Sequence, residues 1–162
     1  MTKRIFAMFT ACVLLMFSAG CGSTEKTAID MTPSEIAESF NKAASDTNFR
    51  LSEVKIGPDN TFTILTADDG VYVSGTLDGG KVSEIEVESI GIFEPSLATY
   101  DYMVYMMMAC DDTVEFDHAD DLIADFYYEA YYGGEEVIGG YNGLQYAFQK
   151  ADGQYWFRIR NI

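Results

Sequence analysis

The sequence predicts an α+β protein of two layers, with three helices packed on one face of an antiparallel sheet. Three observations lead to this prediction. Apolar and polar residues alternate between positions 54 and 87, where closely spaced turn signals divide them into a four-strand meander. A second hairpin is predicted near the C-terminal end, about the Asp152-Gly153 turn. Three segments with helical apolar spacing flank the strands, and such helices pack on one face of an antiparallel sheet.

The first predicted helix spans residues 32–46 and begins with a capping signal. Thr32 can cap the helix, Pro33 suits the first helical position, and Glu35 can reach back to the cap. Apolar residues then recur at helical spacing, with polar residues on the opposite side. The third predicted helix, 117–131, carries a comparable apolar stripe that includes Ile123 and Phe126.

The second predicted helix, residues 95–110, is apolar nearly all round. Its expected core stripe consists of Leu97, Tyr100, Val104, Met107 and Met108. Further apolar side chains lie elsewhere round the helix, namely Tyr102, Met103, Tyr105 and Met106. Such a helix is either covered on every side or leaves a patch exposed. Because the predicted elements leave little to cover its outer side, we expect an exposed patch that binds a partner or supports weak homo-oligomerisation.

Turn chemistry predicts which meander residues face each other. The predicted cross-strand pairs are Ile56–Phe62 at the 58–60 loop, Thr66–Val73 at the two-residue Asp69-Gly70 turn, and Val73–Ile85 at the 78–80 loop. These registers place one apolar set toward the helices, namely Val54, Ile56, Phe62, Ile64, Val73, Leu77, Ile85 and Val87. Tyr72, Glu84 and Glu86 are expected on the solvent side.

The first 21 residues carry a targeting pattern. Lys3 and Arg4 precede an apolar run, 5–17, and small residues then lead into a cysteine at Ser18-Ala19-Gly20-Cys21. This stretch resembles the signal peptide and lipobox of bacterial lipoproteins. The resemblance implies that residues 1–20 are removed and that acylated Cys21 holds the mature chain on the outer face of the cell membrane.

The same resemblance sets the expected domain organisation. Residues 1–20 form the signal peptide, residues 21–31 a lipidated tether, and residues 32–162 one α+β domain. A mature domain of this length suits a single core. The lipid bilayer is then a partner through Cys21, and the apolar run is shorter than the ~20 residues of a spanning helix.

Charge limits the partners of the mature chain. Without residues 1–20 it holds 26 acidic and 8 basic residues, a formal net charge of −18. This charge argues against nucleic-acid binding, which depends on neutralising phosphates. Residues 82–149 contain 15 acidic residues and no Lys or Arg. That interval can attract a cationic peptide or protein, or it can serve solubility alone.

No catalytic motif and no cofactor motif appear in the sequence. Cys110 follows a run of methionines, which favours a core role, although a Cys110–His118 pair is a conceivable nucleophile and base. An acidic cluster between residues 111 and 121 is typical of solvated helix flanks and leaves weak calcium binding as an alternative. We predict no metal site and no enzymatic activity.

The C-terminal hairpin supplies a second candidate surface. Its outward face places Trp156, Arg158 and Arg160 in one row, flanked by Gln145 and Gln149. Tryptophan and arginine are enriched at binding hot spots, so the row can form a platform for an acidic peptide or a glycan. The simpler interpretation, which we favour, is that the arginines neutralise acidic residues of the meander.

Together these observations predict a membrane-anchored, extracytoplasmic lipoprotein that acts as a non-enzymatic binding module. The alternatives are a small-ligand or calcium-binding lipoprotein and, less favoured, a cysteine-dependent enzyme. The candidate binding residues are Trp156, Arg158, Arg160, Tyr102, Tyr105 and Met106. Cys21 is the predicted lipidation site.

Replacing Cys21 by alanine tests the predicted anchor. We expect the Cys21→Ala protein to remain an uncleaved, unlipidated precursor, because the acyl chains attach to the Cys21 thiol. Metabolic labelling with a fatty acid and detergent phase partitioning measure this outcome. A Cys21→Ala protein that still matures and partitions like the wild type contradicts the lipobox interpretation.

Overall fold

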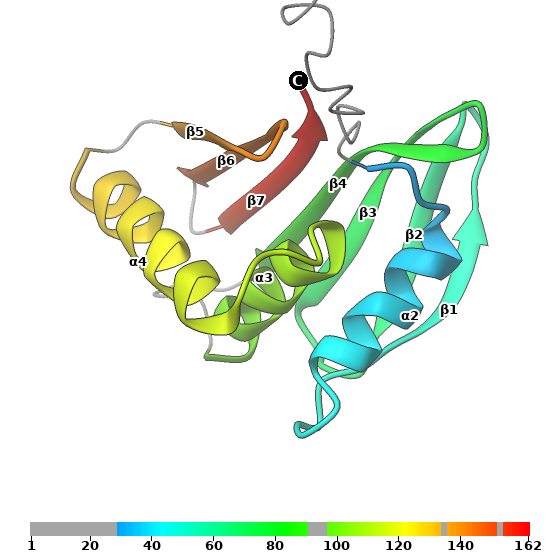
Figure 1. The fold of residues 1–162 in the computed structure, drawn as a ribbon, viewed down its shortest axis with the longest axis horizontal. Coiled ribbons are helices and arrows are strands. Elements are labelled where there is room, and N and C mark those ends of the chain that lie inside the picture. Colours follow the sequence, from blue (N-terminus) through cyan, green and yellow to red (C-terminus); the bar gives the residue numbers. More distant parts are fainter. Residues whose placement is uncertain (1–28, 91–96, 134–135, 152–153) are drawn as a thin grey trace, which may run out of the picture.

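The computed structural model describes residues 29–90, 97–133, 136–151 and 154–162 (Figure 1). Cys21 and the predicted signal peptide lie outside these residues, as do the Glu94-Pro95 start of the second predicted helix and the Asp152-Gly153 turn. None of the helices in the described ranges has the length and apolarity needed to cross a membrane.

The described elements follow the order expected for an α+β chain. The helices are α2 (Pro33–Ala43), α3 (Leu97–Cys110) and α4 (Phe116–Gly133). The strands are β1 (Leu51–Ile56), β2 (Thr61–Thr66), β3 (Val71–Asp78), β4 (Lys81–Ile90), β5 (Val137–Tyr141), β6 (Leu144–Ala151) and β7 (Gln154–Asn161). The predicted capping box at the start of α2 is confirmed, because Thr32 and Glu35 bond to each other's backbone N–H.

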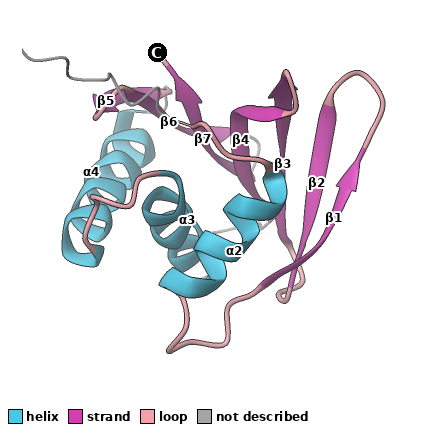
Figure 2. Ribbon diagram, turned by 45° about the vertical axis from the view of Figure 1, so that its right-hand side comes forward, coloured by secondary structure: helices cyan, strands magenta, loops and turns pink. Residues whose placement is uncertain are grey.

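All strands in the described ranges belong to one seven-stranded antiparallel sheet with the order β1-β2-β3-β4-β7-β6-β5. The three described helices lie together on one side of this sheet, and none of them covers the other side, which we call the open face (Figures 1 and 2). The meander and the C-terminal hairpin are therefore parts of one sheet, because β4 pairs with β7.

The prediction of four strands plus a hairpin was incomplete, because β5 adds a seventh strand beside β6. Its two glycines made this segment resemble a connection. One of them has a packing role: a Cβ atom on Gly139 would lie 2.6 Å from Cζ of Phe126 in α4. The absence of a side chain at Gly139 allows α4 to pack directly on the strand.

The register of the meander is partly as predicted. The Ile56–Phe62 pair is confirmed, and so is the Phe148–Phe157 pair that a two-residue turn at Asp152-Gly153 predicts. The next two registers were wrong by two residues: Val73 pairs with Ile64 and with Val87. The side chain of Thr66 closes a longer loop than expected by donating to the backbone oxygens of Asp68 (3.0 Å) and Val71 (2.8 Å).

A slip of two residues leaves the buried face unchanged, because side chains alternate with a period of two. Phe62, Ile64, Val73, Ile85 and Val87 are accordingly buried as predicted. Ile56 is a correction, since 62% of it is exposed. It precedes the β1–β2 turn, which extends past the N-terminal start of α2 (Figure 2).

The predicted exposed patch on α3 is also wrong. Tyr102, Met103 and Met106 are fully buried, and Tyr105 packs partly buried against the core. The reason is that α3 lies between α2 and α4 and also rests on the sheet (Figure 2). The buried hydroxyl of Tyr102 has hydrogen-bond partners within the protein. It donates to the Arg50 carbonyl at 3.1 Å and accepts from the N–H of Ala67 at 3.1 Å.

Replacing Phe62 by alanine tests the assigned core face. We expect the free energy of unfolding to fall by about 3–5 kcal/mol, because the deleted ring would leave a cavity. The Phe62 side chain is 1% exposed, whereas Leu65 on the same strand is 44% exposed. Denaturant unfolding followed by circular dichroism measures both variants, and Leu65→Ala should lose under about 1 kcal/mol. A comparably small loss for Phe62→Ala would contradict this face assignment.

Candidate functional site

The predicted Trp156–Arg158–Arg160 row lies on the open face of the sheet, at its centre. Each member faces a glutamate of β4 across the strand pair, in the order Glu88–Trp156, Glu86–Arg158 and Glu84–Arg160. The structure thus brings the three residues of the row together, as the alternation of β7 predicts.

Acidic and amide side chains already engage Arg158. Its Nε lies 3.1 Å from a carboxylate oxygen of Glu86, and its Nη2 lies 3.5 Å from Glu136 and 3.0 Å from the amide oxygen of Gln149. Burial raises the pKa of Glu86, and Glu88 and Glu84 raise it further against the opposing effect of Arg158. These contacts are what the neutralising interpretation of Arg158 predicts.

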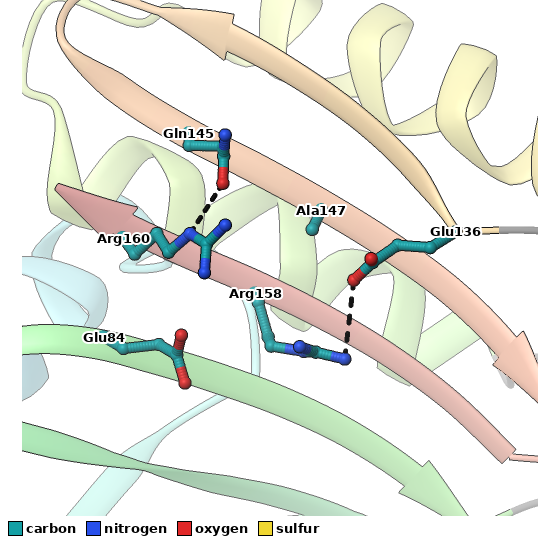
Figure 3. A pocket seen from close by; sticks show the side chains of 6 residues that line it. All are labelled: Glu84, Glu136, Gln145, Ala147, Arg158 and Arg160. Carbon is teal, nitrogen blue, oxygen red and sulfur yellow. Dashed lines mark hydrogen bonds and ion pairs between the residues drawn. The ribbon is translucent and has the colours of Figure 1, made fainter. Parts of the chain in front are cut away.

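A small hollow of about 60 Å³ lies between the two arginines (Figure 3). Its lining combines the guanidinium groups of Arg158 and Arg160 with the carboxylates of Glu84 and Glu136. Arg160 donates from Nε to the amide oxygen of Gln145 at 2.6 Å. Equal numbers of acidic and basic groups give this hollow little attraction for an acidic peptide.

A much larger cavity lies at another part of the domain, and we call it the acidic groove. Its volume is about 1110 Å³. The lining comes from the start of the described chain, from α2, from the end of α3 with its following loop, from the β5–β6 turn and from the end of β7. The lining residues are Asp30, Met31, Ser39, Ala109, Cys110, Asp111, Asp112, Thr113, Asn142, Gly143, Leu144, Asn161 and Ile162.

Hydrogen bonds between distant segments hold the walls of the acidic groove. Asp111 accepts from the N–H of Thr113 at 3.0 Å and from its hydroxyl at 2.6 Å. The other oxygen of Asp111 accepts from the side-chain amide of Asn142 at 2.8 Å. At the end of β7, the N–H of Ile29 donates to the Asn161 side chain at 2.6 Å. These contacts fix the position of the β5–β6 turn relative to the α3–α4 loop.

Left-handed backbone conformations shape the β5–β6 turn. Asn142 has φ of 50° and Gly143 has φ of 78°. Asparagine followed by glycine tolerates this conformation, and such two-residue turns match the twist of a hairpin. The turn therefore presents the Asn142 side chain to the groove wall without strain.

Cys110 lines the acidic groove but remains a buried residue, as predicted. Burial, with a smaller contribution from Asp111, raises the pKa of its thiol to about 12. The thiolate form that acts as a nucleophile is therefore disfavoured at neutral pH. His118 is exposed, and its ring lies 4.9 Å from the ring of Tyr141.

A buried tyrosine hydroxyl lies beside the same site. Among the described residues, the Tyr146 hydroxyl has no hydrogen-bond partner, although Tyr146 is fully buried. Burial raises its pKa, and Cys110 and Asp111, which both line the groove, raise it further. The described residues contain no group of three or more His, Cys, Asp or Glu side chains that could hold a metal ion.

No pattern in the sequence predicted the acidic groove. Asp30, Asn142 and Asn161 have no shared motif, because Asp30 lies more than a hundred residues before the two asparagines. The run of asparagine and glycine at 142–143 was the one available signal, since it predicts a tight turn. The site residues predicted on α3 contribute to the core instead.

Comparison with known proteins identifies no relative: no family model, no curated protein and no solved structure matches this chain. The function of the chain therefore has to be inferred from its geometry and charge.

The reactivity of Cys110 tests its assignment as a structural residue. In the full-length Cys12→Ser, Cys21→Ser chain, we expect the Cys110 thiol to react with a thiol reagent roughly a hundredfold slower in the folded state at pH 8 than in denaturant. The raised pKa keeps the thiol protonated, and burial restricts access. A matched variant that carries Cys110→Ser and Ala124→Cys, with the new cysteine at an exposed position of α4, should react rapidly while folded. Equal rates for folded and unfolded Cys110 contradict the assignment.

Proposed function

We propose that this protein is a lipid-anchored, extracytoplasmic binding module without enzymatic activity, and that its acidic groove binds a cationic segment of a peptide or protein. One observation carries the proposal. The charged side chains among the groove residues are Asp30, Asp111 and Asp112, and all of them are acidic. A cavity of this size with acidic walls favours an occupant of opposite charge.

The apolar part of the groove supports the choice of lysine or arginine side chains. Met31, which is partly buried, and Ile162, which is exposed, contribute apolar surface beside the carboxylates. Lysine and arginine combine an aliphatic stem with a charged end, so they can use both kinds of surface at once. Amide oxygens of Asn142 and Asn161 add further acceptors to the lining.

Charge outside the groove supports the same ligand class. The interval 82–149, which includes Asp111 and Asp112, contains no Lys or Arg. Lys81 partly offsets Asp30, since its Nζ lies 3.7 Å from the Asp30 carboxylate and 3.7 Å from Glu35. A field of one sign over the remaining walls accelerates the association of cationic partners.

The proposed anchor would keep the groove close to the membrane. Asp30 and Met31 line the groove, and Cys21 precedes them by only a few residues. Eight residue steps separate Cys21 from Ile29, and a chain spans at most about 3.6 Å per residue, or about 29 Å in all. A partner in the groove would therefore lie within reach of the outer membrane surface.

Neutralising exposed groove carboxylates tests the proposal. Asp30→Asn with Asp112→Asn should weaken binding of labelled hexalysine by about three- to tenfold, because each exposed charge contributes only a few tenths of a kcal/mol to about 1 kcal/mol. Fluorescence anisotropy measures the affinity at low salt. The matched control is Asp59→Asn with Asp78→Asn, which makes the same change in net charge at exposed turns outside the groove.

The control separates a local site from general charge attraction. The control pair should leave the affinity nearly unchanged if the groove binds the peptide. Equal effects of the two pairs would show that hexalysine responds to net charge alone, and the proposed groove function would then be wrong.

A further inference from the structure

We propose that the cationic segment binds in an extended conformation along β5, as an eighth strand of the sheet, and continues into the acidic groove. The choice of a cationic occupant rests on the proposed function of the groove. The pairing with β5 rests on separate observations about the two edges of the sheet.

The edge at β1 is protected. The side chain of Asn41 in α2 donates to the Leu51 carbonyl at 2.8 Å and accepts from the Leu51 N–H at 2.9 Å. A register irregularity between Leu51 and Val54 further disturbs this strand, and Glu53 and Lys55 add charges. Side-chain amides that bond to the edge backbone, bulges and charged residues of this kind prevent another strand from pairing.

The edge at β5 has none of these protections within the described part of the chain. Its five residues, Val137–Tyr141, include no charged residue and no proline. The described hydrogen bonds include none from a side chain to the backbone of these five residues. A sheet edge with free backbone groups and no charge accepts an added strand.

The hairpin pairing shows which backbone groups of β5 face outward. Tyr141 and Leu144 flank the two-residue turn, so they form a hydrogen-bonded pair, and the pairs then alternate along the strands. Gly140–Gln145 and Ile138–Ala147 are consequently non-hydrogen-bonded pairs. The N–H and C=O groups of Ile138 and Gly140 therefore point away from β6, toward an incoming strand.

The β5 edge is continuous with the acidic groove. β5 ends at Tyr141, and the next two residues, Asn142 and Gly143, line the groove. Ile138 is 52% exposed on the open face of the sheet, where it can contact an apolar side chain of an added strand. A strand that pairs with β5 would thus meet the groove carboxylates directly beyond the end of the pairing.

Charge and size favour a cationic peptide over a second copy of this chain. Two copies of the mature chain, with 26 acidic and 8 basic residues each, would each bring a formal net charge of −18. Pairing over five residues also falls well short of the roughly 1,000 Å² that a stable protein interface buries. A cationic strand avoids the repulsion and gains additional contacts in the groove.

The test uses the full-length protein in detergent and an eight-residue peptide of alternating valine and lysine. A second peptide carries a methyl group on the backbone nitrogen of every lysine, which removes the backbone donors of one strand edge. A third peptide carries the methyl groups on the backbone nitrogen of every valine. One of the two methylated peptides should bind about tenfold more weakly or worse, because it loses hydrogen bonds of about 0.5–1.5 kcal/mol each. Bound parent peptide should also slow amide hydrogen exchange at Ile138 and Gly140.

Matched variants locate the pairing. Ile138→Lys should weaken binding of the parent peptide about threefold or more, because it places a lysine of the protein beside the lysines of the peptide. Ile56→Lys makes the same change at an exposed isoleucine of the protected β1 edge and should leave the affinity unchanged.

Failure of this proposal is distinguishable from failure of the groove function. The β5 pairing is overturned if both methylated peptides keep their affinity and Ile138→Lys still binds the parent peptide normally. If the Asp30→Asn and Asp112→Asn pair weakens binding in the same experiment, the groove function remains intact. If the amide hydrogens of Ile138 and Gly140 exchange more slowly as the protein concentration rises in the absence of peptide, the edge pairs with a second copy. That result also overturns the proposal.

Discussion

The pairing of β4 with β7 is the constraint on which the rest of this structure depends. It joins residues 84–90 to residues 154–160 and turns the meander and the C-terminal strands into one sheet. On the helix side this pairing sets Val87 against Phe157 and Ile85 against Ile159, all of them buried. On the open side the same pairing sets Glu86 beside Arg158, which explains why this arginine is neutralised. One backbone ladder thus determines both the core and the charge pattern of the exposed face.

The described helices all lie on one side of the sheet and cover its wide apolar face, and α3 occupies the middle of this helical layer. Burial on several sides explains why this helix is apolar nearly all round. The stacked rings of Phe40 and Tyr102, with centroids 5.2 Å apart, show how closely α2 packs on it. The large apolar surface of α3 therefore stabilises the domain and is not left exposed.

The acidic groove and the β5 edge arise from how the ends of the domain meet. The chain around Ile29 reaches the end of β7 through Asn161, and the β5–β6 turn reaches the α3–α4 loop through Asn142 and Asp111. These contacts join segments distant in sequence and leave a cavity between them. At the other edge of the sheet, the amide of Asn41 satisfies the backbone of Leu51, so the two edges differ in their capacity to accept a strand.

Local patterns in the sequence determined the element types, the buried face of the meander and the cross-strand neighbours of Trp156, Arg158 and Arg160 on β6. These features follow from capping, turn chemistry and the two-residue period of strands, which act over a few residues. The glycines of β5 made the strand hard to predict, and one of them, Gly139, is explained only by the close packing of Phe126 from α4. Only the tertiary structure decided that Tyr102 and Met106 are buried and that Asp30, Asp112 and Asn142 share a groove. The physical reason is that covering a helix or closing a cavity depends on segments far apart in the chain, and no local pattern records where those segments meet.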